Sequence, residues 1–520
     1  MEVLILPTTT FIVALNVRFH ARSWSMTNAA SADVIATPIS TGVPGLDELL
    51  IGGLTPDRMY MVEGSPGTGK TTLALQFLLN GRDAGEKTVY VTLSETVREM
   101  EAIARSHGWS LDGVELFQLS PAEGLKPEDQ YTLYHPAEVE LGETVKSVLE
   151  VIERVQPTRI VFDSLSELKL LARDPLRYRR QILALKEYFS GRECTVVMLD
   201  DLSTGGPDLQ LESLSHGVIL LEMLPFEYGR ARRRLRIVKF RGVAAIEGFH
   251  DFVIRRGGLN VFPQLTSPQQ SAPRAGVVQS GVPELDQLLG GGLTWGTTTL
   301  FIGPAGTGKS TMAAQYAATG VTGTNGAIFL FDERASTFIS RTDALGMKLG
   351  ERVKSGHVSL KQIDPGDMSP GEFSHRVRLA VEREGARVIL IDSLNGYLNA
   401  IPQVEAPLVR MHELLSYLNE RGVVTLMVVA QHGIVGSNMA TPIDVSYLAD
   451  TVVLLRFFES AGVVRRAVSV MKKRSGPHES TIREFQLGPD RLRVGAALSE
   501  FQGVLTGVPH YIGASGPLFK

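Results

Sequence analysis

The sequence is poor in cysteine, since Cys194 is the only one among 520 residues. A disulfide within one chain is therefore impossible, which excludes the disulfide frameworks of small secreted domains. The surrounding stretch, ECTVVML, is apolar and β-branched, so we expect Cys194 to lie in a buried strand rather than to be reactive. The stability of the fold must then come from ordinary hydrophobic cores.

An excess of charge of either sign is also missing. The 52 lysines and arginines nearly balance the 56 aspartates and glutamates, which leaves a formal net charge of −4. This balance argues against a broad nucleic-acid surface, so we do not expect a nucleic-acid partner. The hydrophobic share of 43% and the charged share of 21% are typical of globular proteins. Because a single core stops growing at roughly 250–300 residues, the length predicts two to four domains.

A membrane anchor is not expected either. The first 25 residues, MEVLILPTTTFIVALNVRFHARSWS, are apolar enough to raise the question of export. Glu2 stands where an export signal carries basic residues, Pro7 and a threonine run interrupt the apolar stretch, and the segment is too short to span a bilayer. We expect residues 1–35 to form a disordered leader, with Met26 as an alternative start. We also expect a cytoplasmic protein without membrane association.

Internal repetition is abundant. STGVPGLDELLIGGLTPDRMYMVEGSPGTGKTT from Ser40 matches QSGVPELDQLLGGGLTWGTTTLFIGPAGTGKST from Gln279 without a gap. Two later pairs follow in the same order, RIVFDSLSEL with RVILIDSLNGY and RIVKFRG with VSVMKKRSG, which indicates duplication of a whole domain. The predicted organisation is a leader at 1–35, a first domain at 36–263, a linker at 264–276, a second domain at 277–498 and a C-terminal tail at 499–520.

Short apolar runs alternate with helical stretches within each copy. In the first copy RMYMVEG, TVYVTLS, RIVFD and TVVMLD are predicted strands, and TTLALQFLLNGRDAG is a predicted helix that ends at glycine. Continuous apolar runs of this kind belong to parallel strands covered on both faces. The predicted fold class is therefore α/β, with two tandem domains, each a doubly wound and mainly parallel sheet.

Each copy contains a phosphate loop of the pattern G-x-x-x-x-G-K-[ST] between a strand and a helix. Its glycines let backbone N–H groups point into one cavity, where the start of the following helix adds positive potential. The lysine is expected to reach the outer phosphates of a nucleotide. The residues predicted to bind nucleotide are Gly64, Ser65, Gly67, Thr68, Gly69, Lys70, Thr71 and Thr72, and in the second copy Gly303, Gly306, Thr307, Gly308, Lys309, Ser310 and Thr311.

An acid and a hydroxyl are expected to hold Mg²⁺ at each loop. Asp163 and Asp392 end apolar strands, which is where the magnesium-side carboxylate of such folds lies, although a helix N-cap is the structural alternative. The predicted metal residues are Thr71 and Asp163 in the first copy and Ser310 and Asp392 in the second.

Candidates to orient or activate water stand at the end of the next strand. They are Ser94 and Glu95 in the first copy and Asp332 and Glu333 in the second. Since the second copy has paired carboxylates and the first only one, the two domains are not expected to work at equal rates. Surface placement without a catalytic role is the alternative for any one of these acids.

Basic residues recur late in each copy. Lys239 and Arg241 stand on or just after a strand, where alternation would project both to one side, and Lys472 and Arg474 occupy similar positions in the second copy. In ring-shaped ATPases such residues reach the phosphates held by the neighbouring subunit, whereas a solvated basic face is the alternative. The run RARRRLR at 230–236 is ambiguous between these interpretations, and a hairpin tip is a further possibility for it.

Together these residues resemble the circadian clock protein KaiC family, which is itself RecA-like. The resemblance covers roughly residues 39–509 and rests on the doubled GTGK loops, STGVPGLDELL, VKFRG, GLNVFP and TIREF. It implies a double-ring homohexamer with ATP and Mg²⁺ held between subunits. It also implies that one ring works as a slow ATPase and timer or assembly module, while the other acts as a serine autokinase and phosphatase.

Family site residues can be carried over by position. The paired catalytic glutamates fall on Ser94 and Glu95 and on Asp332 and Glu333, so the first domain lacks one acid and the second has a shorter one. The basic residues that contact ATP across the subunit boundary fall on Lys239 and Arg241 and on Lys472 and Arg474.

The adjacent serine and threonine that clock proteins phosphorylate fall on Ser446 and Tyr447, so only the serine is retained. Ser446 is therefore the predicted phosphorylation site, with Thr441 as a nearby candidate, and a plain loop position is the alternative. The tail FQGVLTGVPHYIGASGPLFK lacks the longer peptide that KaiA recognises, so KaiA is not expected to bind. A KaiB-like protein and a histidine kinase are the candidate partners besides a second copy of the chain.

Two other functions stay open at this point. A DNA-acting RecA-like or helicase-like motor needs basic and aromatic loops that grip a single strand. LLARDPLRYRRQ in the first copy fits that need, but NGYLNAIPQVEAPLVRM in the second copy is not basic. A nucleotide-gated scaffold with little turnover is the other possibility. Binding of DNA over a salt series and released phosphate would separate the three.

Overall fold

The computed structural model describes most of the chain. The described residues are 37–119, 136–172, 174–202, 209–225, 230–265, 274–319, 324–364, 366–399, 406–431, 446–460, 462–489, 491–505 and 510–512. The predicted leader at 1–35 and the candidate phosphorylation site Thr441 lie outside them.

The first domain is built on a nine-stranded sheet in the order β3-β2-β4-β5-β1-β6-β7-β8-β9. In this spatial order the six strands β3, β2, β4, β5, β1 and β6 are parallel to one another, whereas β6, β7, β8 and β9 pair antiparallel. Its strands are β1 (Met59–Gly64), β2 (Thr88–Thr92), β3 (Val114–Gln118), β4 (Arg159–Asp163), β5 (Thr195–Asp201), β6 (Gly217–Leu224), β7 (Arg232–Phe240), β8 (His250–Arg255) and β9 (Gly258–Phe262).

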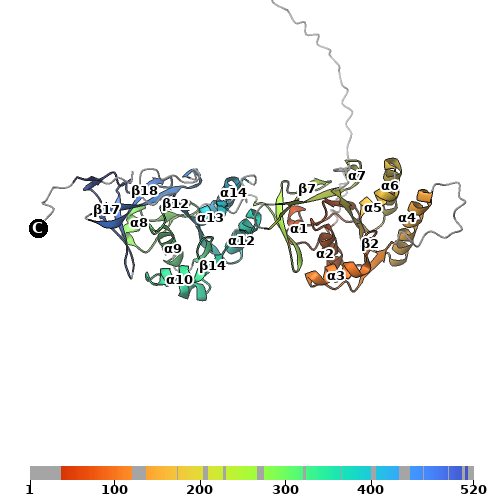
Figure 1. Ribbon diagram of the computed structural model, residues 1–520, viewed down its shortest axis with the longest axis horizontal. Helices are drawn as coiled ribbons and strands as arrows, with labels where there is room; N and C mark the ends of the chain where they lie inside the picture. The colour runs from red at the N-terminus through yellow and green to blue at the C-terminus, as the bar shows by residue number, and fades with distance from the viewer. Residues whose placement is uncertain are drawn as a thin grey trace, which may run out of the picture. The chain divides into compact units, whose positions relative to one another are not determined.

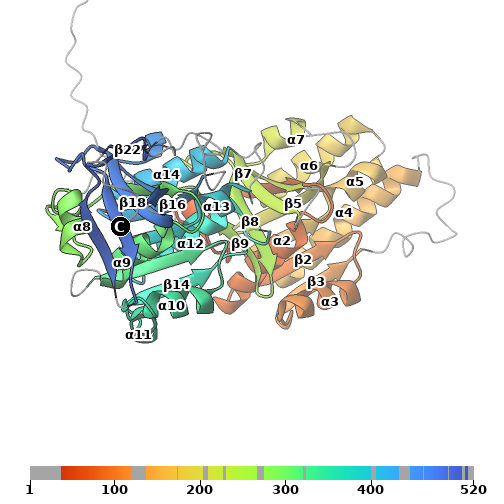
Figure 2. The same ribbon diagram turned by 60° about the vertical axis from the view of Figure 1, so that its left-hand side comes forward.

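Helices cover both faces of this sheet (Figures 1 and 2). Local sequence sets several of their starts: Thr96 and Glu99 form a capping box at α3, and Asp174 caps α6 with Pro175 in its first position. The helices are α1 (Leu46–Leu49), α2 (Lys70–Asp83), α3 (Val97–His107), α4 (Pro136–Val155), α5 (Leu165–Ala172), α6 (Pro175–Phe189) and α7 (Leu209–Leu214).

The parallel strands are buried on both faces. Because side chains alternate along a strand, Tyr60 of β1 joins one hydrophobic cluster with Leu75 of α2, while Met61 joins another with Ile182 of α6. Every residue of β1, β2 and β4 is buried. This double burial is the physical reason for the continuous apolar runs in the sequence.

The second domain repeats this topology strand for strand, in the order β14-β13-β15-β16-β12-β17-β18-β19-β20. Again the strands from β14 to β17 are parallel and those from β17 to β20 antiparallel. They are β12 (Thr298–Gly303), β13 (Asn325–Leu330), β14 (Val358–Gln362), β15 (Ala386–Asp392), β16 (Val424–Ala430), β17 (Thr451–Ser460), β18 (Val463–Lys473), β19 (Arg483–Leu487) and β20 (Leu492–Ala497).

The described residues of the second domain and the tail also contain seven helices, one 3₁₀ turn and two small two-stranded sheets. The helices are α8 (Pro283–Leu288), α9 (Lys309–Thr319), α10 (Ala335–Asp343), α11 (Leu349–Lys354), α12 (Pro370–Glu382), α13 (Leu394–Asn399), α14 (Pro407–Glu420) and the 3₁₀ turn η4 (Ser446–Leu448). Two small sheets pair β10 (Val277–Val278) with β11 (Leu293–Thr294) and β21 (Phe501–Gln502) with β22 (His510–Tyr511).

The predicted fold class is confirmed, since both domains are α/β with mainly parallel sheets covered on two faces. The strands predicted in the first copy correspond to β1, β2, β4 and β5, and the predicted helix to α2. Cys194 is buried directly before β5, and burial raises the pKa of its thiol to about 12. None of the helices among the described residues combines the length and apolarity that crossing a bilayer requires.

Candidate nucleotide sites

The first phosphate loop lies between β1 and α2. Gly64 at the end of β1 is in register with Asp201 of β5 and with Leu221 of β6, so the loop leaves the sheet between two parallel neighbours. Gly67 and Gly69 have φ angles of 79° and 110°, in the left-handed region that favours glycine. A Cβ at Gly67 would meet no atom within 4 Å, so the space beside the loop is open there.

Lys70 begins α2, and its ammonium group is held within the protein. Its Nζ donates to the backbone oxygens of Gly64 at 2.8 Å and Ser65 at 3.2 Å. It also lies 2.6 Å from Asp201 Oδ1, and the lysine side chain is only 8% exposed. The three protons of the ammonium group therefore have three acceptors around the loop.

The hydroxyl and the acid predicted to bind Mg²⁺ lie together in the first domain. Thr71 Oγ1 donates to Asp163 Oδ2 at 3.3 Å, and the hydroxyl of Tyr90 donates to the same oxygen at 2.5 Å. Asp163 is buried at the end of β4, and burial raises the pKa of its carboxyl. Hydroxyl and carboxylate oxygens are ligands that Mg²⁺ takes together with phosphate oxygens, so this donor set fits a magnesium nucleotide.

The second loop has the same plan with different surroundings. Lys309 Nζ donates to the backbone oxygen of Pro304 at 2.7 Å, and burial lowers the pKa of this lysine to about 8. Asp392 is buried at the end of β15, and burial raises its pKa to about 6, against the effect of a hydrogen bond from Ser310. The hydroxyl and the acid again meet beside the loop lysine.

Replacing Asp392 with asparagine is expected to stabilise the magnesium-free protein at neutral pH. The folded-state pKa of about 6 lies above the ordinary 3.8, so the folded protein loses stability as the pH rises between these values and bears the full cost above 6. Removing the charge should recover about 1–3 kcal/mol of the free energy of unfolding at pH 8.

Thermal unfolding with a chelator present measures this effect. The melting temperature of Asp392→Asn should exceed that of the parent at pH 8, and the difference should shrink towards pH 4, where the parent carboxyl also becomes neutral. An equal or lower melting temperature at pH 8 would contradict the expected cost of this buried charge.

The predicted water-orienting residues of the first domain follow β2 directly. Ser94 is exposed and Glu95 is half-buried. Thr92 Oγ1 accepts a hydrogen bond from the backbone N–H of Glu95 at 2.9 Å, which fixes this residue at the strand end. Burial raises the pKa of Glu95, and the charges of Glu99 and Asp163 add to the shift. Glu95 is therefore close enough to Asp163 to respond to its charge.

Both predicted acids of the second domain have side-chain partners. Ser393 Oγ donates to Asp332 Oδ2 at 2.5 Å. Arg341 Nη2 lies 2.8 Å from Glu333 Oε2, and Arg341 Nη1 donates to Thr311 Oγ1 at 2.5 Å. Arg341, which was not predicted from the sequence, thus links the predicted water-orienting acid to the helix that follows the loop.

Two further arginines near the loops were also missed. Arg233 of β7 contacts its own loop through Nη2, 3.5 Å from the Gly67 oxygen. Arg466 of β18 does the same through Nε, 3.4 Å from the Gly306 oxygen. Both lie in basic stretches of strand, and this composition was the one available sequence signal.

Lys239 lies at the opposite end of the sheet from its own phosphate loop. It pairs with Val218 of β6, and Val218 is in register with Met61 of β1, three residues before Gly64. Three residues of strand span roughly 10 Å. Since β1 and β6 are parallel, Lys239 stands level with the first half of β1 and its Nζ donates to the Ser215 oxygen just before β6, whereas the loop follows the end of β1.

Lys472 occupies the equivalent position in the second domain. It pairs with Val452 of β17, which is in register with Leu300 of β12, again three residues before the loop begins. Its Nζ donates to the backbone oxygens of Ser446 at 3.0 Å and Ala449 at 2.8 Å. The predicted phosphorylation site Ser446 is exposed at the start of η4 and therefore lies beside this lysine.

Arg241 and Arg474 follow these two strands and are exposed. Arg241 Nη2 donates to the backbone oxygen of Ser213 at 2.9 Å, and Arg474 Nη1 lies 3.8 Å from Asp450 Oδ1. Each therefore stays at the same sheet end as its lysine.

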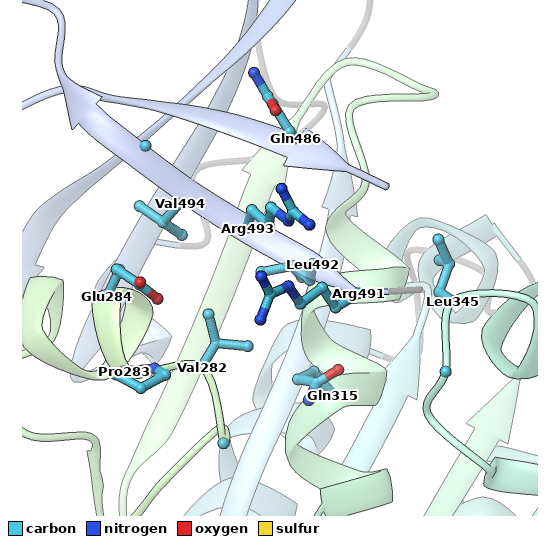
Figure 3. A pocket seen from close by; sticks show the side chains of 13 residues that line it. Val282, Pro283, Glu284, Gln315, Leu345, Gln486, Arg491, Leu492, Arg493 and Val494 are labelled. Carbon is cyan, nitrogen blue, oxygen red and sulfur yellow. The ribbon is translucent and has the colours of Figure 1, made fainter. Parts of the chain in front are cut away.

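A cavity of about 420 Å³ opens beside α9 in the second domain (Figure 3). Gln315 of α9 and Leu345 line it, and Figure 3 shows the side chain of Arg491 extending across it from β20's start. Gln315 follows Thr311 by four residues within α9, so one side of this helix leads from the loop towards the cavity.

The sequence is similar to KaiC proteins along nearly its whole length. A family model described as "ATPase: KaiC" matches residues 39–266 and 278–499. Circadian clock protein KaiC3 of Synechocystis sp. is 25% identical over 492 residues, which cover 92% of this chain and 95% of that protein. The circadian clock oscillator protein KaiC of Synechococcus elongatus is 27% identical over 486 residues, which cover 90% and 91% of the two chains.

Proposed function

This chain belongs to the KaiC ATPase family, and we propose that it is an ATPase and serine autokinase that works as a double-ring homohexamer in signalling or clock-related regulation. One observation carries the proposal: each domain brings a loop lysine, a hydroxyl and a buried aspartate together at the carboxyl ends of parallel strands. That combination is what binding and hydrolysis of a magnesium nucleotide require.

The residues around each loop have different roles in the proposed hydrolysis. The loop N–H groups and the lysine hold the β- and γ-phosphates, while the water-orienting acids line up the attacking water. When bound, Mg²⁺ neutralises charge that develops on the phosphate oxygens. The lysines are Lys70 and Lys309, the magnesium residues are Thr71, Asp163, Ser310 and Asp392, and the water-orienting acids are Glu95, Asp332 and Glu333.

The cavity beside α9 is our proposed site for the adenine base in the second domain. Its position along the helix that begins at the phosphate loop supports this assignment. Its lining mixes apolar side chains, such as Val282 and Leu345, with polar ones, such as Gln315 and Arg491, so a planar base could both pack and form hydrogen bonds there.

The sites are proposed to be shared between neighbouring subunits. Lys239 and Lys472 lie about three residues of strand away from their own loops, at the other end of the sheet, so they are poorly placed to reach their own phosphates. In a head-to-tail ring this end of one subunit meets the phosphate loop of the next. Arg241 and Arg474 would then complete the same composite sites.

Ser446 is the proposed autophosphorylation site. Its backbone oxygen accepts a hydrogen bond from Lys472, so its exposed hydroxyl lies beside the cation proposed to reach the neighbour's phosphates. A hydroxyl in that position can attack the γ-phosphate held by the neighbouring subunit, with the transfer aided by the same cation.

Ser446→Ala is expected to abolish incorporation of labelled phosphate from γ-labelled ATP while ATP binding is retained. Thr441→Ala is the matched control and should keep the label, because the proposed site is the serine. Label that persists unchanged in Ser446→Ala, or that is absent from the parent protein, would remove the autokinase assignment at this residue.

Native mass spectrometry with ATP and Mg²⁺ tests the whole proposal in one measurement. We expect six chains, two nucleotides per chain and an added phosphate. A KaiB-like protein or a histidine kinase, our proposed partner classes, can be added in the same experiment. Single chains without nucleotide at saturating ATP would contradict the proposal.

A further inference from the structure

Asp201 distinguishes the first phosphate loop from the second. It is the last residue of β5 and is in register with Gly64, where the loop begins. The same register in the second domain places Ala430 of β16 opposite Gly303. The first loop therefore has a carboxylate beside it at a position where the second has a methyl group.

This carboxylate holds the loop lysine. Asp201 Oδ1 lies 2.6 Å from Lys70 Nζ, and the other two acceptors of that ammonium group are neutral backbone oxygens. Because the ammonium group has three protons, an incoming phosphate must displace one of its acceptors. Asp201 is the acceptor most readily exchanged for phosphate oxygen, since its side chain is 31% exposed and both groups are anionic.

After β2 the first domain has one carboxylate fewer than the second domain has after β13. Ser94 stands where the second domain has Asp332, so Glu95 is the one carboxylate that the sequence predicts for the attacking water. Asp201 adds a second carboxylate from a different strand, next to the group that binds the phosphates.

We propose that Asp201 is a further residue of the first ATP site, with one role before the nucleotide arrives and another afterwards. In the free protein it holds Lys70. When the triphosphate takes over the ammonium group, the released carboxylate accepts a hydrogen bond from the attacking water. The second role rests on the proposed hydrolysis of ATP by the first domain.

The step balances without a further reactant. The water oxygen forms a bond to the γ-phosphorus while the bond from that phosphorus to the bridging oxygen breaks, and its electron pair leaves with ADP. One water proton passes to Asp201 and from its exposed side to solvent. The products are ADP, inorganic phosphate and a proton.

Asp201→Asn tests both roles, because it keeps the shape of the side chain and removes its charge. The full chain should also carry Lys309→Ala, so that the first site alone is measured. We expect a non-hydrolysable ATP analogue to bind about 10-fold more tightly, because a charged competitor for Lys70 is gone. We expect bound ATP to be hydrolysed about 100-fold more slowly in a single turnover. Asp201→Ala should change both quantities in the same directions.

Asp200→Asn is the matched control. Asp200 precedes Asp201 in β5, is buried and accepts a hydrogen bond from Ser166 Oγ at 2.9 Å, and the same Oγ accepts from the Asp201 backbone N–H at 3.0 Å. Because asparagine keeps an oxygen that accepts from Ser166, Asp200→Asn should alter neither analogue binding nor hydrolysis. In a chain with Lys70→Ala, Ala430→Asp is expected to weaken analogue binding at the second loop about 10-fold, since it adds the competitor there.

Unchanged or weaker analogue binding by Asp201→Asn would overturn the proposal, and so would unchanged hydrolysis of bound ATP. Failure of the ATPase proposal itself looks different: the Lys309→Ala chain with Asp201 intact would bind the analogue but not hydrolyse ATP. Tighter binding by Asp201→Asn would still be measurable in that case and would support the first role.

Discussion

Replacing Lys70 with alanine is expected to reduce the ATP-analogue molecules bound per chain from two to one, and Lys309→Ala is expected to do the same at the other loop. Each lysine is buried beside its loop and would lose charge-assisted bonds to the outer phosphates. Such bonds predict a weakening of about 100-fold at the altered site. Equilibrium titration with a non-hydrolysable analogue measures both the number of sites and their affinities.

Lys87→Ala is the matched control for the loop variants. This lysine is exposed directly before β2, at the end of the sheet away from the phosphate loop. The variant therefore changes the charge of the first domain by the same amount without touching the proposed site. It should retain two sites. A Lys70→Ala protein that still binds two analogue molecules with parent-like affinity would contradict the assignment of the first loop.

The parts of each site that the sequence predicts are those whose residues are neighbours in the chain. The loop residues follow one another, and Asp163 could be found because it ends an apolar strand. The Lys70–Asp201 pair joins residues 131 positions apart and depends on which strand lies beside β1. Strand order is not encoded in a local pattern, so this contact needed the structure.

The hydrogen bond from Tyr90 to Asp163 was not predicted for the same reason. Tyr90 is 73 positions away and bonds to Asp163 because β2 and β4 are neighbours in the sheet. In the second domain Ile328 has the equivalent register position, two residues before the partner of Asp392, and it has no hydroxyl. The two metal-side acids therefore have different surroundings even though their local sequences match.

The run RARRRLR begins in the connection of the β6–β7 hairpin, at Arg230, and continues into the second strand of that hairpin. Residues from Arg232 onwards form β7, in which Leu235 is buried and Arg236 is exposed. An antiparallel strand with one solvated face tolerates alternate arginines, whereas the parallel strands of this sheet do not. The apolar runs that predict parallel strands are therefore a poor guide to β7, β8 and β9.

Register also decides what the late basic residues can do. Alternation places Lys239 and Arg241 on one side, and both contact backbone oxygens at the C-terminal end of α7 or directly after it. Only the pairing of β7 with β6, and of β6 with β1, shows that this is the end of the sheet away from the loop.

Mixing Lys70→Ala chains with Arg241→Ala chains is expected to restore ATP hydrolysis that neither variant has alone. All chains should carry Lys309→Ala so that only the first domain is measured. In a shared site, an intact loop from one chain meets an intact arginine from its neighbour. A random equal mixture should therefore regain about a quarter of the parent turnover, because half of the loops and half of the arginines are intact.

A mixture of Lys70→Ala with Asp163→Asn is the matched control. Lys70 and Asp163 belong to the same chain's side of the site, since Thr71, which follows the lysine, donates to the aspartate. No combination of these chains rebuilds a complete site, so turnover should stay at the level of the separate variants. Recovery in both mixtures would point to general stabilisation on mixing, and recovery in neither would contradict the role of Arg241 across the boundary. Recovery confined to the Arg241→Ala mixture requires that one subunit's phosphate loop and the next subunit's basic strand end form a single site.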